Sequence, residues 1–253
     1  MKWVLPIFFA LSGFLTQAFA TNSLHVQGAY FATPTERYAH NIMGSLPAHI
    51  DLVVSTAQCK TCATNTSSLT ARLPENLVFE DFAPRLIDLD NDGQQEILVV
   101  ESDQQQGSRL AMWEIKQGQL VRGASSAFIG QRFRWLAPIG VADFYRNGKP
   151  LIAYVEKPHL DKVLRLVRRE GNQLVQVEQV SGITNHLIGQ ETVQSRIEYC
   201  PNGPMIVALS SDAQRILTVQ WAAKGHIVRD AGPAVSRSLP NQNSFSRLCS
   251  NVE

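Results

Sequence analysis

Residues 88–96 read Asp-Leu-Asp-Asn-Asp-Gly-Gln-Gln-Glu, and the apolar run Ile-Leu-Val-Val follows at once at residues 97–100. Carboxylates at every second position, then a glycine and a further carboxylate, form an oxygen cage that suits a hard cation such as Ca²⁺. The apolar run has the length and composition of a buried β-strand. An EF-hand is excluded, because its twelfth position would be Val99, inside that strand.

Apolar runs of this kind recur along the chain at a nearly constant spacing, which is the signature of a repeat architecture. They begin at Glu96, Leu151 and Met205, so their offsets are 55 and 54 residues. A second run follows each of them after a polar turn, and a third follows after a glycine turn. A short segment also precedes each set, and these segments span 82–87, 136–141 and 185–189. Each unit is therefore expected to form four short strands joined by Gly, Asn and Asp turns.

A fourth, partial unit lies upstream, where residues 38–44 match the leading segment and residues 50–54 match the first apolar run. Four antiparallel strands leave exposed edges and cannot bury both faces alone, whereas sheets packed radially around an axis can. We therefore expect an all-β fold, a small β-propeller of four or five four-stranded blades. A fifth blade would join residues 24–31 to residues 245–248 and close the ring.

The predicted organisation is a leader followed by one domain. Residues 1–20 hold a basic start, an apolar stretch and an Ala-Phe-Ala site, which is the pattern of a cleavable signal peptide. Residues 21–253 form a single propeller domain, with units at 37–76, 77–125, 126–180 and 181–231 and a closing segment at 232–253. We expect a secreted or periplasmic protein that does not insert into a membrane after cleavage.

Charge restricts the classes of partner. The chain has 23 basic and 22 acidic residues, and loss of Lys2 with the leader would make the mature net charge zero. Nucleic acids and anionic membranes are bound by surfaces with an excess of Lys and Arg, so neither is expected as the partner. An unknown protein or glycan ligand remains, and we expect a monomer.

The four cysteines are Cys59, Cys62, Cys200 and Cys249. In an exported protein an even number favours disulfides, and four cysteines allow three pairings. We favour Cys59–Cys62 as the closure of a local loop and Cys200–Cys249 as a link from the C-terminus to the body. Cys59 and Cys62 also fit a redox pair or half of a zinc site, although the following Ala, Thr, Asn and Ser do not predict the helix that a redox motif opens.

The segment from Phe82 to Glu101 resembles an FG-GAP or VCBS-type repeat, the unit of integrin-α-like propellers that also occurs in many exported bacterial proteins. The resemblance implies one structural Ca²⁺ in the loop between the first and second strands of a blade. The ligands that it implies are the side chains of Asp88, Asp90, Asp92 and Glu96 and the main-chain carbonyl of Gln94, with Gly93 at the sharp turn.

The next unit departs from this pattern. It keeps an aspartate and a glycine at Asp143 and Gly148, but Tyr145 and Leu151 stand where the pattern has carboxylates. We expect the same turn there without an ion.

Basic side chains lie in or beside the leading segments, at Arg37, His40, Arg85, Arg134, His186 and, near the C-terminus, Arg247. The leading strand of a propeller blade runs beside the central channel, so these groups could form a site for a carboxylate, a phosphate or an acidic glycan. The alternative is that they pair with carboxylates such as Glu36, Glu80, Asp81 and Glu101 and hold the blades together. The sequence leaves both interpretations open.

No catalytic residues are predicted, because the chain has no Gly-x-Ser-x-Gly motif. The histidines show no short paired spacing that would suggest a metal site. Two carboxylates such as Asp81 and Glu101 could serve a glycosidase only if they faced each other across a cleft. The expected function is a non-catalytic calcium-binding module or scaffold. The alternatives are a polysaccharide-active enzyme that uses the central channel and a lectin-like sugar binder that uses Trp135.

Overall fold

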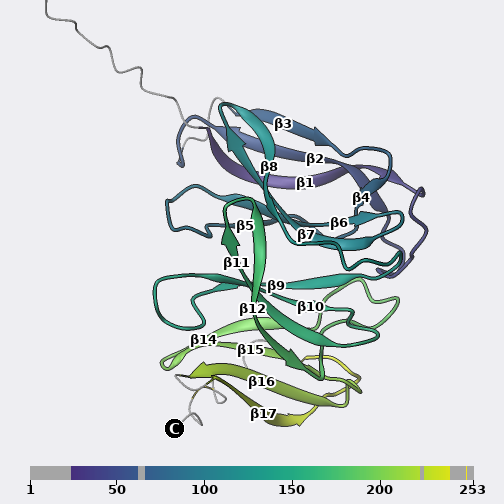
Figure 1. The fold of residues 1–253 in the computed structure, drawn as a ribbon, viewed down its shortest axis with the longest axis vertical. Coiled ribbons are helices and arrows are strands. Elements are labelled where there is room, and N and C mark those ends of the chain that lie inside the picture. Colours follow the sequence, from purple (N-terminus) through teal and green to yellow (C-terminus); the bar gives the residue numbers. More distant parts are fainter. Residues whose placement is uncertain (1–23, 62–65, 223–224, 240–248, 250–253) are drawn as a thin grey trace, which may run out of the picture.

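The computed structural model describes residues 24–61, 66–222, 225–239 and 249, and the predicted leader lies outside these residues. Seventeen β-strands account for the regular structure of this part of the chain, which confirms the prediction of an all-β fold (Figure 1). The strands form one sheet of twelve strands and another of five. Their bounds are β1 His25–Thr35, β2 Ala48–Ala57, β3 Ser67–Arg72, β4 Leu77–Phe79, β5 Arg85–Ile87, β6 Glu96–Asp103, β7 Gly107–Lys116, β8 Gln119–Ser125, β9 Leu136–Ala142, β10 Leu151–Glu156, β11 Val163–Glu170, β12 Gln173–Ser181, β13 Ile183–Thr184, β14 Arg196–Cys200, β15 Gly203–Ser210, β16 Arg215–Ala222 and β17 Gly225–Pro233.

Three antiparallel meanders follow one another along the chain. The first meander comprises β5 to β8, the second comprises β9 to β12, and the third comprises β14 to β17, with neighbouring strands paired in chain order. In each of them the second strand is one of the three recurring apolar runs, in β6, β10 and β15. The recurring runs therefore occupy the same structural position.

The edge of β6 and the edge of β15 each carry two short strands instead of one long strand. β4 pairs with β6 at residues 101–103, while β5 pairs with it at residues 96–98. In the same way, β13 and β14 pair with opposite ends of β15. The residues between the two short strands, 80–84 and 185–195, leave the sheet and pack against other parts of the molecule.

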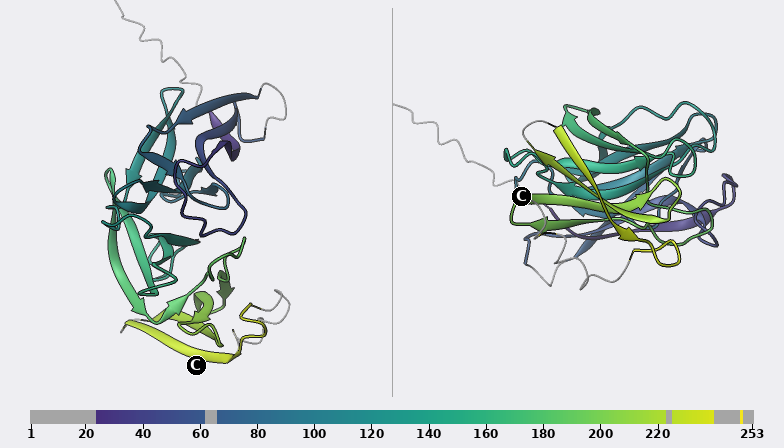
Figure 2. Two further views of the ribbon diagram at one scale, coloured as in Figure 1. Left: turned by 90° about the vertical axis from the view of Figure 1, so that its right-hand side faces the viewer. Right: turned by 90° about the horizontal axis from the view of Figure 1, so that it is seen from below.

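The meanders succeed one another along an arc, with β1 to β3 at one end and β14 to β17 at the other (Figure 2). A hydrophobic core lies between each pair of neighbours, and alternate side chains of one strand enter different cores. In β6, Ile97 and Val99 pack toward β2, whereas Leu98 and Val100 pack toward β10. This two-sided burial explains why the run is continuously apolar rather than alternating.

The N-terminal region differs from the sequence prediction. Residues 38–44 were expected to form a leading strand, but they lie in the loop between β1 and β2. Side chains hold this loop, because the Tyr38 hydroxyl accepts a hydrogen bond from Phe133 N at 3.0 Å. β1 pairs with β2 from His25 to Thr35, so the N-terminal strand does not contribute to a separate closing blade, and residues 245–248 lie outside the described residues.

The same loop reaches the segment between β13 and β14, which leads into the third meander. Gly189 N donates a hydrogen bond to Ile42 O at 3.2 Å, and Ser45 donates to the Glu191 carboxylate through both its N–H and its hydroxyl. We call residues 38–46 the N-terminal strap. It connects the two ends of the arc without a sheet ladder.

A disulfide joins Cys200 to Cys249, which confirms the predicted link between the C-terminal region and the body. Cys200 ends β14, and both cysteines pack with Met205 and Val207 on the outer side of the third meander. Cys59 is also disulfide-bonded, while its predicted partner Cys62 lies outside the described residues.

Candidate functional site

The acidic loop lies between β5 and β6, as the calcium pattern requires. Its turn is built by backbone N–H groups that donate to its own carboxylates. Gly93 N donates to Asp88 Oδ2 at 3.1 Å, Asp92 N donates to Asp90 Oδ1 at 3.3 Å, and Gln94 N donates to Asp92 Oδ1 at 2.7 Å. Gly93 has a φ of +85°, a conformation that glycine adopts at little cost.

This turn gathers three carboxylates. One oxygen each from Asp88, Asp90 and Asp92 lies within 4.8 Å of the other two. Asp88 Oδ1 is buried and has no hydrogen-bond partner, and a buried unpaired carboxylate oxygen is costly. A hard cation would supply the missing partner and offset the repulsion among the three charges. The residues present therefore fit a Ca²⁺ ion.

Glu96 is 4% exposed at the start of β6, and its Oε2 accepts a hydrogen bond from Leu89 N at 3.0 Å. Burial raises the pKa of Glu96, the Leu89 N–H opposes this shift, and the nearby charges of Asp90 and Asp92 add to it. Glu96 thus ties the loop to the strand behind it. Gln94 lies in the loop with its N–H bonded to Asp92, and the ligand roles implied for Glu96 and Gln94 stay predictions.

The corresponding loop of the second meander, between β9 and β10, has the same turn. Gly148 N donates to Asp143 Oδ2 at 2.7 Å, and Lys149 N donates to Asn147 Oδ1 at 3.0 Å. The difference is at the other oxygen of the aspartate, because Asp143 Oδ1 accepts from Asn147 N at 3.0 Å. Both oxygens of Asp143 are therefore satisfied by the backbone, and the loop needs no ion to complete them.

The basic residues predicted for the channel do not form one cluster, because two of the described ones lie apart from the other three. Arg37 donates to the carbonyl oxygens of Pro74 and Leu77, and Arg85 forms an ion pair with Asp81 at 2.7 Å. Arg247 lies outside the described residues. His40, Arg134 and His186 lie close to a cavity beside Trp135, and of these His40 and Arg134 line it.

His40 belongs to a buried polar network next to that cavity. Its Nδ1 lies 2.7 Å from Glu80 Oε1, and the other carboxylate oxygen of Glu80 accepts from Ser102 Oγ at 2.5 Å. The ring of His40 stacks on Phe133 with centroids 5.0 Å apart. Glu80 is thus a partner of His40, as the pairing interpretation of the sequence allowed.

A pair of histidines beside Trp135 was not predicted from the sequence. His159 Nε2 lies 2.9 Å from His186 Nδ1, and His186 Nε2 lies 2.8 Å from Gln190 O. Burial lowers the pKa of His159 to about 4, with His186 adding to the shift, and burial also lowers the pKa of His186. The two residues are 27 positions apart, so no local motif marks the pair.

The three tryptophans of the described residues have structural roles. Trp113 in β7 and Trp221 in β16 are buried in hydrophobic cores. Trp135 is only 2% exposed, and its indole N–H donates to Glu80 O at 2.8 Å. The indole ring therefore has little exposed surface with which to stack on a sugar, as the lectin-like alternative would need.

Among the residues that the structure describes, no helix is long and apolar enough to span a bilayer. No protein-family model matches this sequence, and no curated protein is detectably similar to it.

Proposed function

We propose that this protein is an exported, calcium-stabilised β-propeller of the FG-GAP or VCBS type that acts as a non-catalytic binding module. The observation that carries the proposal is the difference between two equivalent loops. Asp143 has both carboxylate oxygens bonded to backbone N–H groups, whereas Asp88 keeps one buried oxygen without a partner beside two further carboxylates.

The propeller assignment is supported by the arrangement of the strands. Three meanders follow one another in chain order around an arc, and each strand such as β6 sends alternate side chains into the cores on its two sides. Radially packed blades have this property. With β1 to β3 as a further unit, four blades account for the described strands other than β4 and β13.

The ion has a structural role in this proposal. The acidic loop joins β5 to β6, so a bound cation would fix the connection between the edge of a blade and its central strand. Ligand binding to the folded state alone stabilises it by an amount that grows with the ratio of the free ligand concentration to its Kd. Calcium would therefore raise the unfolding temperature.

The non-catalytic role is supported by the state of the candidate acids. Asp81 is buried and accepts a hydrogen bond from Arg85, and Glu101 is fully buried and accepts from Arg109 and Arg122. Neither carboxylate is free to act on a substrate. Export is supported by the Cys200–Cys249 disulfide, because such bonds persist in oxidising compartments.

A thermal unfolding experiment tests the proposal. EDTA should lower the Tm of the wild-type protein, excess Ca²⁺ should restore it, and Asp90→Ala should abolish the response. Asn147→Ala, in the corresponding loop of the second meander, should leave the response intact. A wild-type melting curve that is the same in EDTA and in Ca²⁺ would remove calcium from the account.

A further inference from the structure

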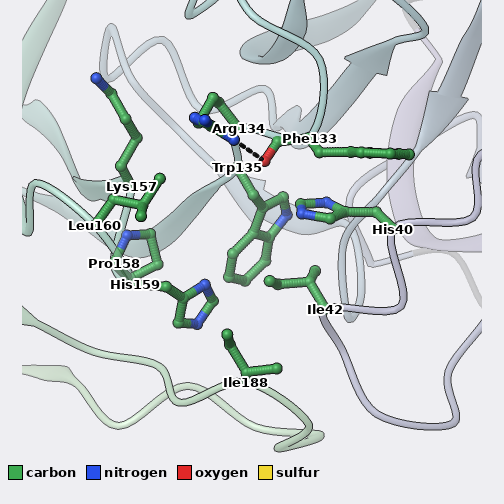
Figure 3. A pocket seen from close by; sticks show the side chains of 10 residues that line it. All are labelled: His40, Ile42, Phe133, Arg134, Trp135, Lys157, Pro158, His159, Leu160 and Ile188. Atoms are coloured by element: carbon green, nitrogen blue, oxygen red, sulfur yellow. Dashed lines mark hydrogen bonds between the residues drawn. The ribbon is translucent and has the colours of Figure 1, made fainter.

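A cavity of about 250 Å³ lies beside Trp135, where four separate segments meet (Figure 3). They are the N-terminal strap, the segment before β9, the turn between β10 and β11, and the loop between β13 and β14. Because a water molecule occupies roughly 30 Å³ in the liquid, a cavity of this volume has room for a molecule of on the order of ten non-hydrogen atoms. It lies apart from the acidic loop, and the two share no residue.

The walls of this cavity are mainly apolar. Ile42, Trp135 and Pro158 form part of its lining. Leu160 and Ile188 also line it, and they are 55% and 70% exposed. Large aliphatic side chains left in water around a concave apolar site favour a ligand that covers them.

The positive charge at the cavity that has no ion-pair partner among the described residues belongs to Arg134. Its guanidinium donates to Phe133 O at 3.2 Å and forms no ion pair with a carboxylate of the described residues. The nearest acidic influence is Asp161, whose pKa is lowered mainly by Lys157 and in part by the charge of Arg134. The other cation at the cavity, Lys157, is already paired with Asp161 at 2.5 Å. A guanidinium without an acidic partner can bind a carboxylate through two parallel hydrogen bonds.

The two histidines add a neutral polar group rather than a second charge. His186 Nε2 must donate to Gln190 O, because a carbonyl only accepts, so His186 Nδ1 is the acceptor for His159 Nε2–H. This order of donors leaves Nδ1 of His159 without a hydrogen. The lining thus offers one free cation and an uncharged imidazole among apolar side chains.

We propose that this cavity binds a small monoanion, a carboxylate carried on an aromatic or branched aliphatic body. The carboxylate bonds to Arg134, and the apolar body packs against Ile42, Leu160 and Ile188. A multiply charged phosphate fits less well, because Arg134 is the free cation among the described residues that line the site. The inference names a ligand class for the proposed binding module and rests on that role, but it does not depend on calcium.

Isothermal titration calorimetry of the mature protein in Ca²⁺ buffer tests the ligand class. The probes are phenylacetate, 3-methylbutanoate, the neutral isostere 2-phenylacetamide and inorganic phosphate. At least one carboxylate should bind about tenfold or more tightly than the amide and than phosphate. The amide carries no negative charge to pair with Arg134, and phosphate has no apolar body to pack against the lining. Equal affinity for phenylacetate and 2-phenylacetamide, or no binding of either carboxylate, would overturn the proposal.

Variants test the location. Arg134→Gln should weaken carboxylate binding about tenfold or more, and Ile188→Asp should weaken it too by placing a negative charge at an exposed position of the lining. Arg132→Gln is the matched control, because Arg132 lies two residues away, is exposed and does not line the cavity, although it stacks on the lining residue Phe133. If Arg132→Gln weakens binding as much as Arg134→Gln does, the carboxylate does not bind at Arg134 in this cavity.

The outcome is separable from the calcium test. Carboxylate binding that persists in an Asp90→Ala variant without a calcium response would refute only the structural ion. A calcium-dependent Tm together with failed carboxylate binding would refute only this ligand class.

Discussion

Asp88 and Asp143 occupy the same position in two loops, and each accepts a hydrogen bond from the N–H five residues ahead, at Gly93 and Gly148. The residue three positions after each aspartate also has a positive φ, 59° at Asn91 and 53° at Arg146. The backbone turn is thus common to both loops. The two loops differ in their side chains, since Asp90 and Asp92 in the first correspond to Tyr145 and Asn147 in the second.

This pair gives a matched comparison. In EDTA, Asp143→Ala should lower the free energy of unfolding by about 1 kcal/mol, because it removes two hydrogen bonds that hold the turn. Asp88→Ala should lower it less, because it removes one hydrogen bond and also relieves the repulsion with Asp90 and Asp92. Only Asp88→Ala should also remove the extra stability that Ca²⁺ provides. Urea unfolding of both variants, with and without calcium, measures the two effects, and a lost calcium response in Asp143→Ala would contradict the assignment.

Glu101 should be a large contributor to stability. Its carboxylate is fully buried and accepts hydrogen bonds from Arg109 at 2.7 Å, from Arg122 at 2.9 Å and from the Trp113 indole at 3.0 Å. Glu101→Gln should lower the free energy of unfolding by about 3 kcal/mol, because two arginines lose their counter-charge. Glu156→Gln is the control in the second meander, where the pair with Arg165 is more exposed, and should cost about 1 kcal/mol. Chemical denaturation of both variants measures the difference, and equal losses would contradict this role.

His159 should make stability depend on pH below neutrality. Its pKa is about 4 in the folded protein, against about 6.5 in an unfolded chain, owing to burial and to the neighbouring His186, His40 and Lys162. The unfolded state therefore takes up a proton first as the pH falls. The contribution is fully present above pH 6.5 and is lost toward pH 4.

After allowance for partial exposure, the loss should be about 1 to 2 kcal/mol. The measurement is the free energy of unfolding against pH for the wild type and for His159→Gln, which cannot titrate. The difference between the two proteins should shrink as the pH falls from 6.5 to 4. A difference that is constant over this interval would show that His159 does not titrate as described.

The Cys200–Cys249 disulfide should stabilise the protein strongly. The two cysteines are 49 residues apart, and loop-closure entropy gives about 4 kcal/mol for a loop of this length. Unfolding of a Cys200→Ser, Cys249→Ser double variant against the wild type measures the effect. If the double variant is as stable as the wild type, the bond does not constrain the chain.

The central strands and the acidic turn could be predicted because their signals are local. Strands buried on both faces are continuously apolar, as β6 and β10 are, and a recurring spacing places them in equivalent positions. The turn around Gly93 follows from its own residues. The Cys200–Cys249 pairing was one of three options and was favoured by the position of Cys249 near the C-terminus.

The N-terminal region could not be predicted in the same way. Tyr38, Ile42 and Met43 are buried, and apolar residues in a packed loop give the same sequence pattern as a short strand. The partner of β1 is decided by long-range pairing with β2, which no local signal encodes. The cavity was missed for a related reason, because Arg134, His159 and Ile188 come from three segments that are brought together only by the fold.

The N-terminal strap has a consequence for how the molecule loses its structure. Proteins built from stacked repeats often melt in stages, since each unit touches only its neighbours. Here Ile42 and Ser45 bond to Gly189 and Glu191, about 145 positions later in the chain. Neither end can detach without breaking contacts made by the other, so denaturation should be a single cooperative transition. A fragment that ends before β13 should not fold, because it lacks both partners of the strap.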